Sequence, residues 1–468
     1  MEGLEATEVR YSTLDDVIDY RIEAEYFDSK FLNVDKKLST ITTVPFIKVA
    51  SFKNGRPYSS ACFNFSSGVK VGKIGDITNK RDISSWEFVE VDEFFNQAGQ
   101  LLTAGDILMT LTGDPPDVGR VNYMYNPVNA TWNQRVAKIR LIDDQNVYID
   151  NDVLYAILST ETVRTQLERY AKGIRQRNLG NESLERLLLP IISNELQIAV
   201  KSCVEEVYVL YHGSIDLYNN AENILREYLG LTSVELDNIE PSIKSITNSL
   251  IISGRLDAEY YQPKYDDLIN LVMSHQTGFD KIENLYFLKD RNYTPEKGSI
   301  YKYIELSNIG TDGSITGYTE AYGEDLPSRA RRIVRAGDLI ISSLEGSLQH
   351  CAIIPEQYDG AICSTGFYVL TPRDINIETS LVLFKSQLVQ ELMRRVCSGS
   401  IMAAMNTDEF MNIVIPKIDR QTQHIIEDMV RESTQKREES IRLLELAKSA
   451  VEVAIEQGED KALELLTQ

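Results

Sequence analysis

Cysteine, histidine and tryptophan are scarce in this chain of 468 residues, which holds only 5, 4 and 2 of them. The cysteines are scattered and form no C-x-x-C pair, which argues against a zinc site or a disulfide scaffold and fits a reducing cytoplasm. No apolar run approaches the roughly 18–20 residues that a membrane-spanning helix needs. The acidic start MEGLEATEVRYSTLDD lacks the basic-then-apolar order of a signal peptide. We therefore expect a cytoplasmic protein without a metal, a cofactor of its own or a membrane partner.

Motifs of catalysis are also missing from the sequence. There is no G-x-x-x-x-G-K-[ST] phosphate loop, no H-E-x-x-H and no G-x-S-x-G. The stretch GDPPDVG (113–119) has the Asp-Pro-Pro of DNA amino-methyltransferases, but Asp117 stands where those enzymes need an aromatic residue to stack on a flipped base. We interpret it as a turn and expect no enzyme activity in this chain.

Positive charge is in short supply, because 48 Lys and Arg face 70 Asp and Glu and leave a net charge of −22. Proteins that bind nucleic acid usually carry a basic footprint. Acidic residues are in greatest excess, per residue, in segments 191–250 and 421–468. Any surface that binds an anion must therefore be local and must lie on the two larger segments.

The chain does contain an internal repeat. The stretch RIEAEYFDSKF (21–31) returns as RLDAEYYQPKY (255–265), half a chain later. Three further pairs keep the same order: VGKIGDI with LSNIGTD, LLTAGDILMTLTG with IVRAGDLIISSLEG, and LERLLLPIISNELQ with FMNIVIPKIDRQTQ. A period this long indicates a duplicated domain rather than a solenoid. In each half, short runs of β-branched and aromatic residues come first and a helical segment follows.

The helical segment that closes each half carries an a/d pattern of apolar residues over several heptads. The first seam comprises Val200, Val204, Val207, Tyr211, Ser214, Tyr218, Ala221, Leu225 and Tyr228. The second comprises Ile426, Val430, Ser433, Ser440, Leu444, Ala447, Val451 and Ala454, with Arg437 interrupting it. A helix of this length needs a partner for its apolar stripe. We expect the two helices to pair as a coiled coil.

The repeated segments 21–31 and 255–265 predict a helix start. Pro263 suits the first position of a helix, and Asp28 is a better cap residue than its counterpart Gln262. The preceding RIEAEY and RLDAEY are expected to be extended and to pack against the paired helices. Because they are alike, we assign them to folding or assembly. We expect the residues that recognise a ligand to lie in the loops where the two halves differ.

Basic and amide-rich stretches differ between the halves. Lys and Arg neutralise phosphates, Arg also bonds guanine, and Gln or Asn bonds adenine. The candidate DNA-binding residues are Lys70, Lys73, Lys80, Arg81, Asn133, Gln134, Arg135, Lys172, Arg175, Gln176, Arg177 and Asn178 in the first half, and Arg329, Arg331, Arg332, Arg335, Ser400 and Asn406 in the second.

Taken together, the AEYF/AEYY segments, the AGDIL/AGDLI segments and the Pro-containing stretches before each long helix resemble the DNA-specificity subunit of Type I restriction-modification systems. The first copy departs from the family's P-P-x-x-x-Q by reading Pro190-Ile191-Ile192, but it keeps Gln197. The resemblance implies two α/β (α+β) recognition domains in tandem, related by a pseudo-two-fold axis and separated by an antiparallel two-helix coiled coil. It places recognition domains at 1–190 and 251–418, spacer helices at 191–231 and 419–458, a linker at 232–250 and a tail at 459–468.

The same resemblance implies a function. Each recognition domain would read one half of a bipartite target in double-stranded DNA, and the helices would hold the readers at a fixed spacing. Two methyltransferase subunits, which bring S-adenosylmethionine, and translocating restriction subunits would be the partners.

Two other interpretations stay open from the residues. In the first, the chain is a scaffold or DNA mimic that binds methyltransferase subunits without reading DNA. In the second, it is an autonomous DNA-modifying enzyme. Basic clusters that contact DNA would exclude the first, and absence of S-adenosylmethionine binding would exclude the second.

Overall fold

The structure is a computed structural model, and the chain divides into two compact units. The first unit contains residues 1–212 and 437–468, and the second contains residues 213–436. The described residues are 7–9, 23–63, 67–78, 83, 86–90, 101–114, 117–125, 129–142, 148–173, 176–231, 243–247, 249, 251, 254–310, 313–399 and 403–467.

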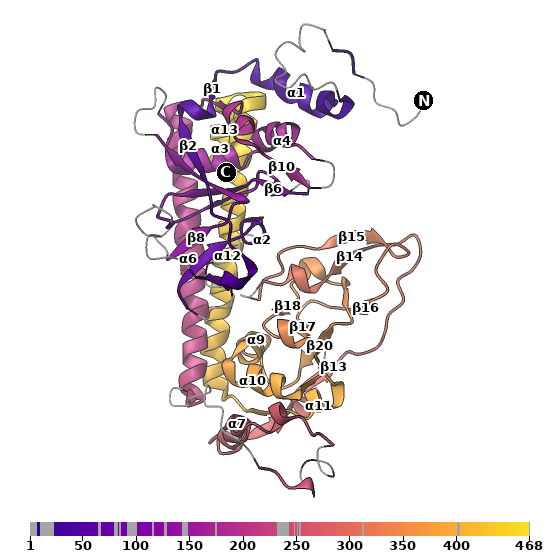
Figure 1. Cartoon of the computed structure of the whole chain (residues 1–468). Helices are drawn as coiled ribbons and strands as arrows, with labels where there is room; N and C mark the ends of the chain where they lie inside the picture. The colour runs from indigo at the N-terminus through magenta and orange to yellow at the C-terminus, as the bar shows by residue number, and fades with distance from the viewer. Residues whose placement is uncertain are drawn as a thin grey trace. The chain divides into compact units, whose positions relative to one another are not determined.

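The first unit combines small sheets with short helices (Figure 1). Its strands are β1 Thr43–Pro45, β2 Ala50–Asn54, β3 Val69–Gly72, β4 Phe88–Val89, β5 Ile107–Thr110, β6 Thr112–Gly113, β7 Val121–Tyr123, β8 Ala130–Trp132, β9 Val136–Leu141, β10 Arg177–Asn178 and β11 Leu188–Pro190. Its helices are η3 Ala24–Phe27, α1 Ser29–Leu38, η4 Phe46–Lys48, η5 Ser60–Phe63, α2 Ile74–Thr78, α3 Asn151–Leu158, α4 Glu161–Tyr170, α5 Asn181–Glu185 and α13 Glu459–Leu466.

The second unit has the same kinds of element in the same order. Its strands are β12 Phe279–Lys281, β13 Tyr286–Leu288, β14 Ile300–Ile304, β15 Thr319–Tyr322, β16 Ala330–Ile333, β17 Leu339–Ser342, β18 Cys351–Ile353, β19 Ile362–Ser364, β20 Phe367–Pro372, β21 Cys397–Ser398, β22 Ala404–Met405 and β23 Val414–Pro416. Its helices are η10 Ala258–Tyr261, α7 Pro263–Met273, α8 Ile282–Leu285, η11 Leu306–Asn308, η12 Glu345–Ser347, η13 Glu356–Tyr358, α9 Ile377–Lys385, α10 Gln387–Val396 and α11 Thr407–Met411. Two long helices, α6 Asn194–Tyr228 and α12 Arg420–Gln457, contribute residues to both units.

The main sheets of the two units correspond, although the second sheet has three strands, β4-β3-β8, in the first unit and four, β15-β14-β19-β16, in the second. The four-stranded sheet β2-β9-β5-β7 in the first unit matches β13-β20-β17-β18 in the second. A second sheet contains the parallel pair β3·β8 in one unit and β14·β19 in the other, although the neighbouring strands are antiparallel. The pair β1·β11 likewise matches β12·β23. The duplication predicted from the repeat is therefore present in the topology, and the mixed α/β fold class is confirmed.

The repeated segments start helices as predicted. The Asp28 side chain accepts a hydrogen bond from Lys30 N at 2.9 Å and caps α1. In the second unit Gln262 makes no such bond, and Pro263 begins α7 instead. One prediction was wrong, because AEYF and AEYY are not extended but form one turn of 3₁₀ helix each, η3 and η10. The residue that precedes each turn, Glu23 or Asp257, has an extended backbone.

Most positions of the predicted seams are buried, with Tyr211, Tyr218 and Tyr228 partly buried, and α6 and α12 lie side by side (Figure 1). In the first unit Val200 and Val204 share a core with Ala447 and Val451. In the second unit Leu225 shares a core with Ile426 and Val430, so the helices run antiparallel. Two polar seam positions are joined by a hydrogen bond, in which Ser433 Oγ donates to Ser214 O at 2.7 Å. Within the described residues, no helix is long and apolar enough to cross a membrane.

Candidate nucleic-acid interface

A tight turn in the first unit presents the predicted residues Asn133, Gln134 and Arg135. It joins β8 to β9 and is held on three sides by backbone hydrogen bonds. Asn133 N donates to Gly72 O at 3.1 Å, Arg56 N donates to Trp132 O at 3.3 Å, and Leu111 N donates to Arg135 O at 2.8 Å. Gln134 and Arg135 are exposed. The backbone of the turn is therefore held in place and presents two exposed polar side chains.

Gly55 shows how closely the chain crosses this turn. A Cβ atom on Gly55 would lie 2.2 Å from Trp132 O and 2.3 Å from Asn133 O, which no real side chain tolerates. The Trp132 side chain is fully buried and donates from Nε1 to Lys53 O at 3.1 Å. Close packing on both sides removes the freedom that a surface turn normally has.

The strand pair β6·β10 brings a second predicted cluster to the same edge. Asn178 pairs with Thr112 in this ladder, and the Thr112 hydroxyl donates to Asn178 Oδ1 at 2.7 Å. Leu179 N donates to Leu111 O at 2.7 Å, while Leu111 N is the group that bonds Arg135 O. We define the polar edge of the first unit as Arg56, Lys73, Thr112, Asn133, Gln134, Arg135, Arg177 and Asn178.

Several cations of this region are already paired with carboxylates. Lys73 Nζ lies 2.7 Å from Glu87, and Lys172 Nζ lies 3.9 Å from Glu182. Arg177 is only about one-fifth exposed and lies 3.7 Å from both Glu25 and Glu168.

The other candidates of the first half lie in different settings. Lys70 donates to Ile83 O at 2.9 Å and is partly buried in the β3 sheet. Gln176 is exposed beside β10. Lys80, Arg81 and Arg175 lie outside the described residues, as does Ser400 in the second half.

The second unit builds the corresponding edge with the same backbone bonds. Ser343 N donates to Gly366 O at 2.8 Å, as Leu111 N does to Arg135 O. Met405 N donates to Ser343 O at 2.8 Å, as Leu179 N does to Leu111 O. The turn itself is one residue shorter and reads Thr365-Gly366. The scaffold of the edge is thus repeated while its side chains are not.

The arginines predicted in the second half are divided between two places. Arg329 reaches this edge, because its carbonyl accepts a bond from Thr365 N at 2.9 Å, and its guanidinium pairs with Glu305 at 3.1 Å. Arg335 is at the opposite end of β17 from Ser343 and pairs with Asp359 at 3.2 Å.

Arg331, Arg332 and Asn406 serve partly structural purposes. Arg331 donates to Ser328 O at 2.9 Å, and Arg332 is half-buried in β16. The Asn406 side chain caps α11 by accepting from Asp408 N at 2.9 Å, although it directly follows β22 at the edge.

The repeated AGD segments hold a buried carboxylate rather than a ligand site. Asp106 and Asp338 are almost fully buried, and each accepts a backbone N–H three residues earlier, from Thr103 at 2.7 Å and from Arg335 at 2.8 Å. Asp338 is also paired with Lys289 at 2.7 Å. Gly105 and Gly337 adopt positive φ angles of 83° and 80° to make the turn.

Two arginines that the sequence analysis did not single out fix the repeated segments. Arg169 Nε donates to Tyr26 O at 2.9 Å, and Arg395 Nε donates to Tyr260 O at 3.2 Å. Each guanidinium lies 4.3 Å from the centre of the same tyrosine ring. These tyrosines therefore contact α4 and α10, while Tyr265 of the second segment shares a core with Leu225 of α6 and Ile426 of α12. The sequence contained a signal for this contact, because an arginine stands at matching positions in the two halves.

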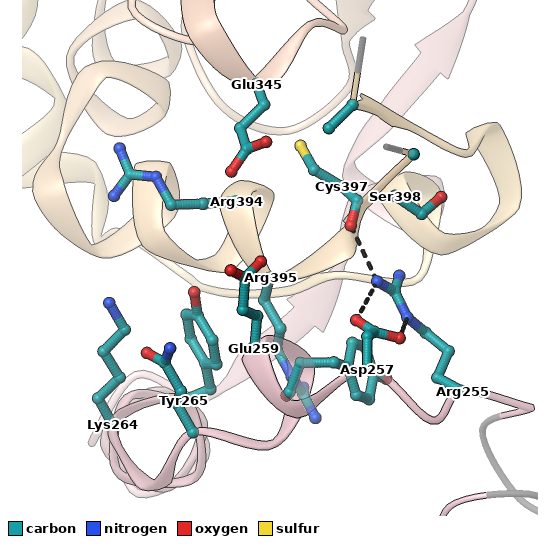
Figure 2. Close-up of a pocket in the computed structure, with 14 residues that line it drawn as sticks. Arg255, Asp257, Glu259, Lys264, Tyr265, Glu345, Arg394, Arg395, Cys397 and Ser398 are labelled. Atoms are coloured by element: carbon teal, nitrogen blue, oxygen red, sulfur yellow. Dashed lines mark hydrogen bonds and ion pairs between the residues drawn. The ribbon is translucent and has the colours of Figure 1, made fainter. Parts of the chain in front are cut away.

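In the second unit a pocket of about 360 Å³ lies beside this contact (Figure 2). Arg255 bonds Asp257 at 2.7 Å and Cys397 O at 2.9 Å along one wall. The Arg255 guanidinium holds the pKa of Asp257 below its usual range. Lys264 is paired with Glu391 at 2.8 Å. The lining is a network of ion pairs that ties the repeated segment to the end of α10.

Nothing in the described part of the chain groups three or more His, Cys, Asp or Glu side chains in a way that would hold a metal ion. The arrangement offers polar edges with exposed amide and guanidinium groups, which suits recognition of an extended polar ligand.

No protein-family model and no curated protein matches this chain. Among solved structures, the chain is similar to the S subunit of a Type I restriction-modification system from M. genitalium, with 16% identity, a TM-score of 0.38, and 91% of this chain and 95% of that chain covered. It is similar to the HsdS subunit from Thermoanaerobacter tengcongensis, with 12% identity, a TM-score of 0.29, and coverage of 89% and 97%. A chain from a study of complex assembly and conformational transition of the type I R-M system has 12% identity, a TM-score of 0.28, and coverage of 89% and 98%.

Proposed function

We propose that this chain is a non-catalytic, sequence-specific DNA-recognition subunit of a Type I restriction-modification complex. The observation that carries the proposal is the repeated edge, in which equivalent backbone bonds, Leu111 N to Arg135 O and Ser343 N to Gly366 O, hold the turn 133–135 in one unit and the turn 365–366 in the other. A common scaffold with different polar side chains is what two readers of different sequences require.

A bipartite target follows from the same duplication. Each unit would read one half-site, and a gap between the half-sites would stay unread. Because α6 and α12 each contribute to both units, they are suited to set that gap. Two methyltransferase subunits would supply S-adenosylmethionine, and translocating restriction subunits would complete the complex in the cytoplasm. The recognition-domain and spacer-helix boundaries predicted above are part of this proposal.

The net charge of −22 limits what the chain does alone. Phosphate contacts supply most of the affinity for DNA, so the isolated chain should bind DNA weakly at physiological salt. Fluorescence anisotropy with a labelled duplex should show strong binding only after methyltransferase subunits are added. Tight specific binding by the isolated chain would contradict this.

A variant separates the proposal from the scaffold or DNA-mimic alternative. Replacing Arg177 with Ala should weaken DNA binding by the assembled complex while the complex still forms, as judged by size-exclusion chromatography. The control is Lys48→Ala, an exposed cation at the other end of β2 from Gly55. Weaker assembly, with normal DNA binding by the fraction of complex that does form, would favour the scaffold. Binding of S-adenosylmethionine by the purified chain, measured by calorimetry, would instead indicate an autonomous enzyme.

A further inference from the structure

Most candidate cations at the two edges are paired with carboxylates. Pairing distinguishes cations that attract phosphate from side chains that are able to read a base. Lys73, Arg177 and Arg329 each have an acidic partner within 3.7 Å. A paired cation still attracts phosphate, but its N–H donors are already paired with a carboxylate of the protein. A side chain that reads a base needs donors and acceptors that no protein group already uses, on a backbone that is held in place.

Gln134 and Arg135 meet that requirement. Both are exposed, and within the described part of the chain neither side chain makes a hydrogen bond, an ion pair or a ring contact. Their backbone is nevertheless clamped, because Arg135 O accepts from Leu111 N at 2.8 Å and Val136 N donates to Asn133 O at 3.1 Å.

Asn133 has a different role in the same turn. Its Oδ1 accepts from Arg135 N at 3.0 Å, so the amide is used to shape the turn. Asn133 is therefore a positioning residue, and the two residues after it carry the free polar groups.

We infer that Gln134 and Arg135 are specificity-determining residues of the first unit and that they contact bases in the major groove. The side-chain amide of Gln134 pairs bidentately with an adenine, and the guanidinium of Arg135 pairs bidentately with a guanine. The half-site contacted by the first unit therefore contains both purines. This inference rests on the proposed function.

The corresponding turn of the second unit cannot read bases in the same way. Thr365 and Gly366 carry no amide or guanidinium, so the shorter turn admits close approach of the backbone but no bidentate contact. The two half-sites are accordingly recognised by different chemistry on one scaffold.

The test is selection of binding sites from a random duplex library by the full chain assembled with its methyltransferase subunits. In Arg135→Ala, preference for a guanine at one position of one half-site should fall about tenfold to a hundredfold, with the other half-site unchanged. Gln134→Ala should relax an adenine position of the same half-site. Lys48→Ala is the matched control and should select the wild-type motif.

Arg135→Lys distinguishes a base contact from a phosphate contact. It keeps the positive charge but replaces the planar guanidinium with a single ammonium, so the guanine preference should weaken while the salt dependence of binding stays as in wild type. If Arg135→Ala weakens binding to all sequences alike and Arg135→Lys restores it, the base-reading role is wrong. If the wild-type complex selects no bipartite motif, the proposed function fails and the base-reading role falls with it.

Discussion

Arg169 and Arg395 occupy equivalent places in the two units and stabilise equivalent contacts. Each guanidinium donates to the carbonyl of a tyrosine in the repeated segment and covers the ring of that tyrosine. Arg169 also pairs with Asp35 at 2.6 Å. This shared packing explains why the repeated segments are alike. The guanidinium contacts both the carbonyl and the ring of the tyrosine, so a substitution of the tyrosine would lower stability.

Replacing Arg169 with Ala should therefore lower the free energy of unfolding of the first unit. The side chain is largely buried, and the loss of its hydrogen bond and ring contact should cost about 2 kcal/mol. Urea denaturation measures the change, and the exposed Lys36→Ala serves as the control. The selected DNA motif should stay the same. A switch in the DNA sequence that is read would contradict the assignment of this contact to folding.

At the scale of elements, the paired helices α6 and α12 depend on a buried seam with an exposed opposite face. Val200 is fully buried in this seam, whereas Val209, on the same helix, is 65% exposed. Burial of apolar area is what stabilises such a pair. The heptad pattern predicted the seam because the spacing of apolar residues depends only on helix geometry.

Val200→Ala should destabilise the first unit by about 2 kcal/mol, because it removes two buried methyl groups and leaves a cavity between the helices. Val209→Ala, the same substitution at an exposed position, should change stability by less than about 0.5 kcal/mol. Chemical denaturation followed by circular dichroism gives both values. Equal effects of the two substitutions would mean that the seam is not the stabilising surface.

The first turn of α3 supplies a dependence on pH. Burial raises the pKa of Asp152 to about 6, above the ordinary aspartate value of 3.8. Between these two values the folded state binds more protons than the unfolded state, so stability falls as the pH rises towards 6. Asp152→Asn should remove this slope and increase stability at pH 7–8 by on the order of 1 kcal/mol after solvent screening.

Thermal unfolding of the wild type and Asp152→Asn between pH 4 and 8 measures that difference. Asp150→Asn is the informative comparison, since Asp150 caps the same helix and pairs with Lys201 at 2.9 Å, so its loss should destabilise the unit at neutral pH. Parallel pH profiles for the wild type and Asp152→Asn would show that Asp152 titrates normally.

At the scale of the whole chain, the duplication and the long helices were predictable because both are written as periodic patterns. The polar edge was predictable only in part. Segments around 73, 112, 134 and 178 are far apart in the sequence, and their meeting depends on the parallel pair β3·β8 and the ladder β6·β10. Charge clustering alone also grouped Arg335 with Arg329, although the two residues flank opposite ends of β16. Which cations are paired follows from tertiary structure and has no local signature.

The central claim, that two units on one scaffold read two half-sites, is tested most directly by mapping the adenines that the assembled complex methylates in DNA of random sequence. The complex contains the full chain, its methyltransferase subunits and S-adenosylmethionine. Two short specified blocks separated by a gap of constant length and free sequence are the predicted result. A single contiguous block, a gap of variable length, or methylation without sequence preference would contradict the account.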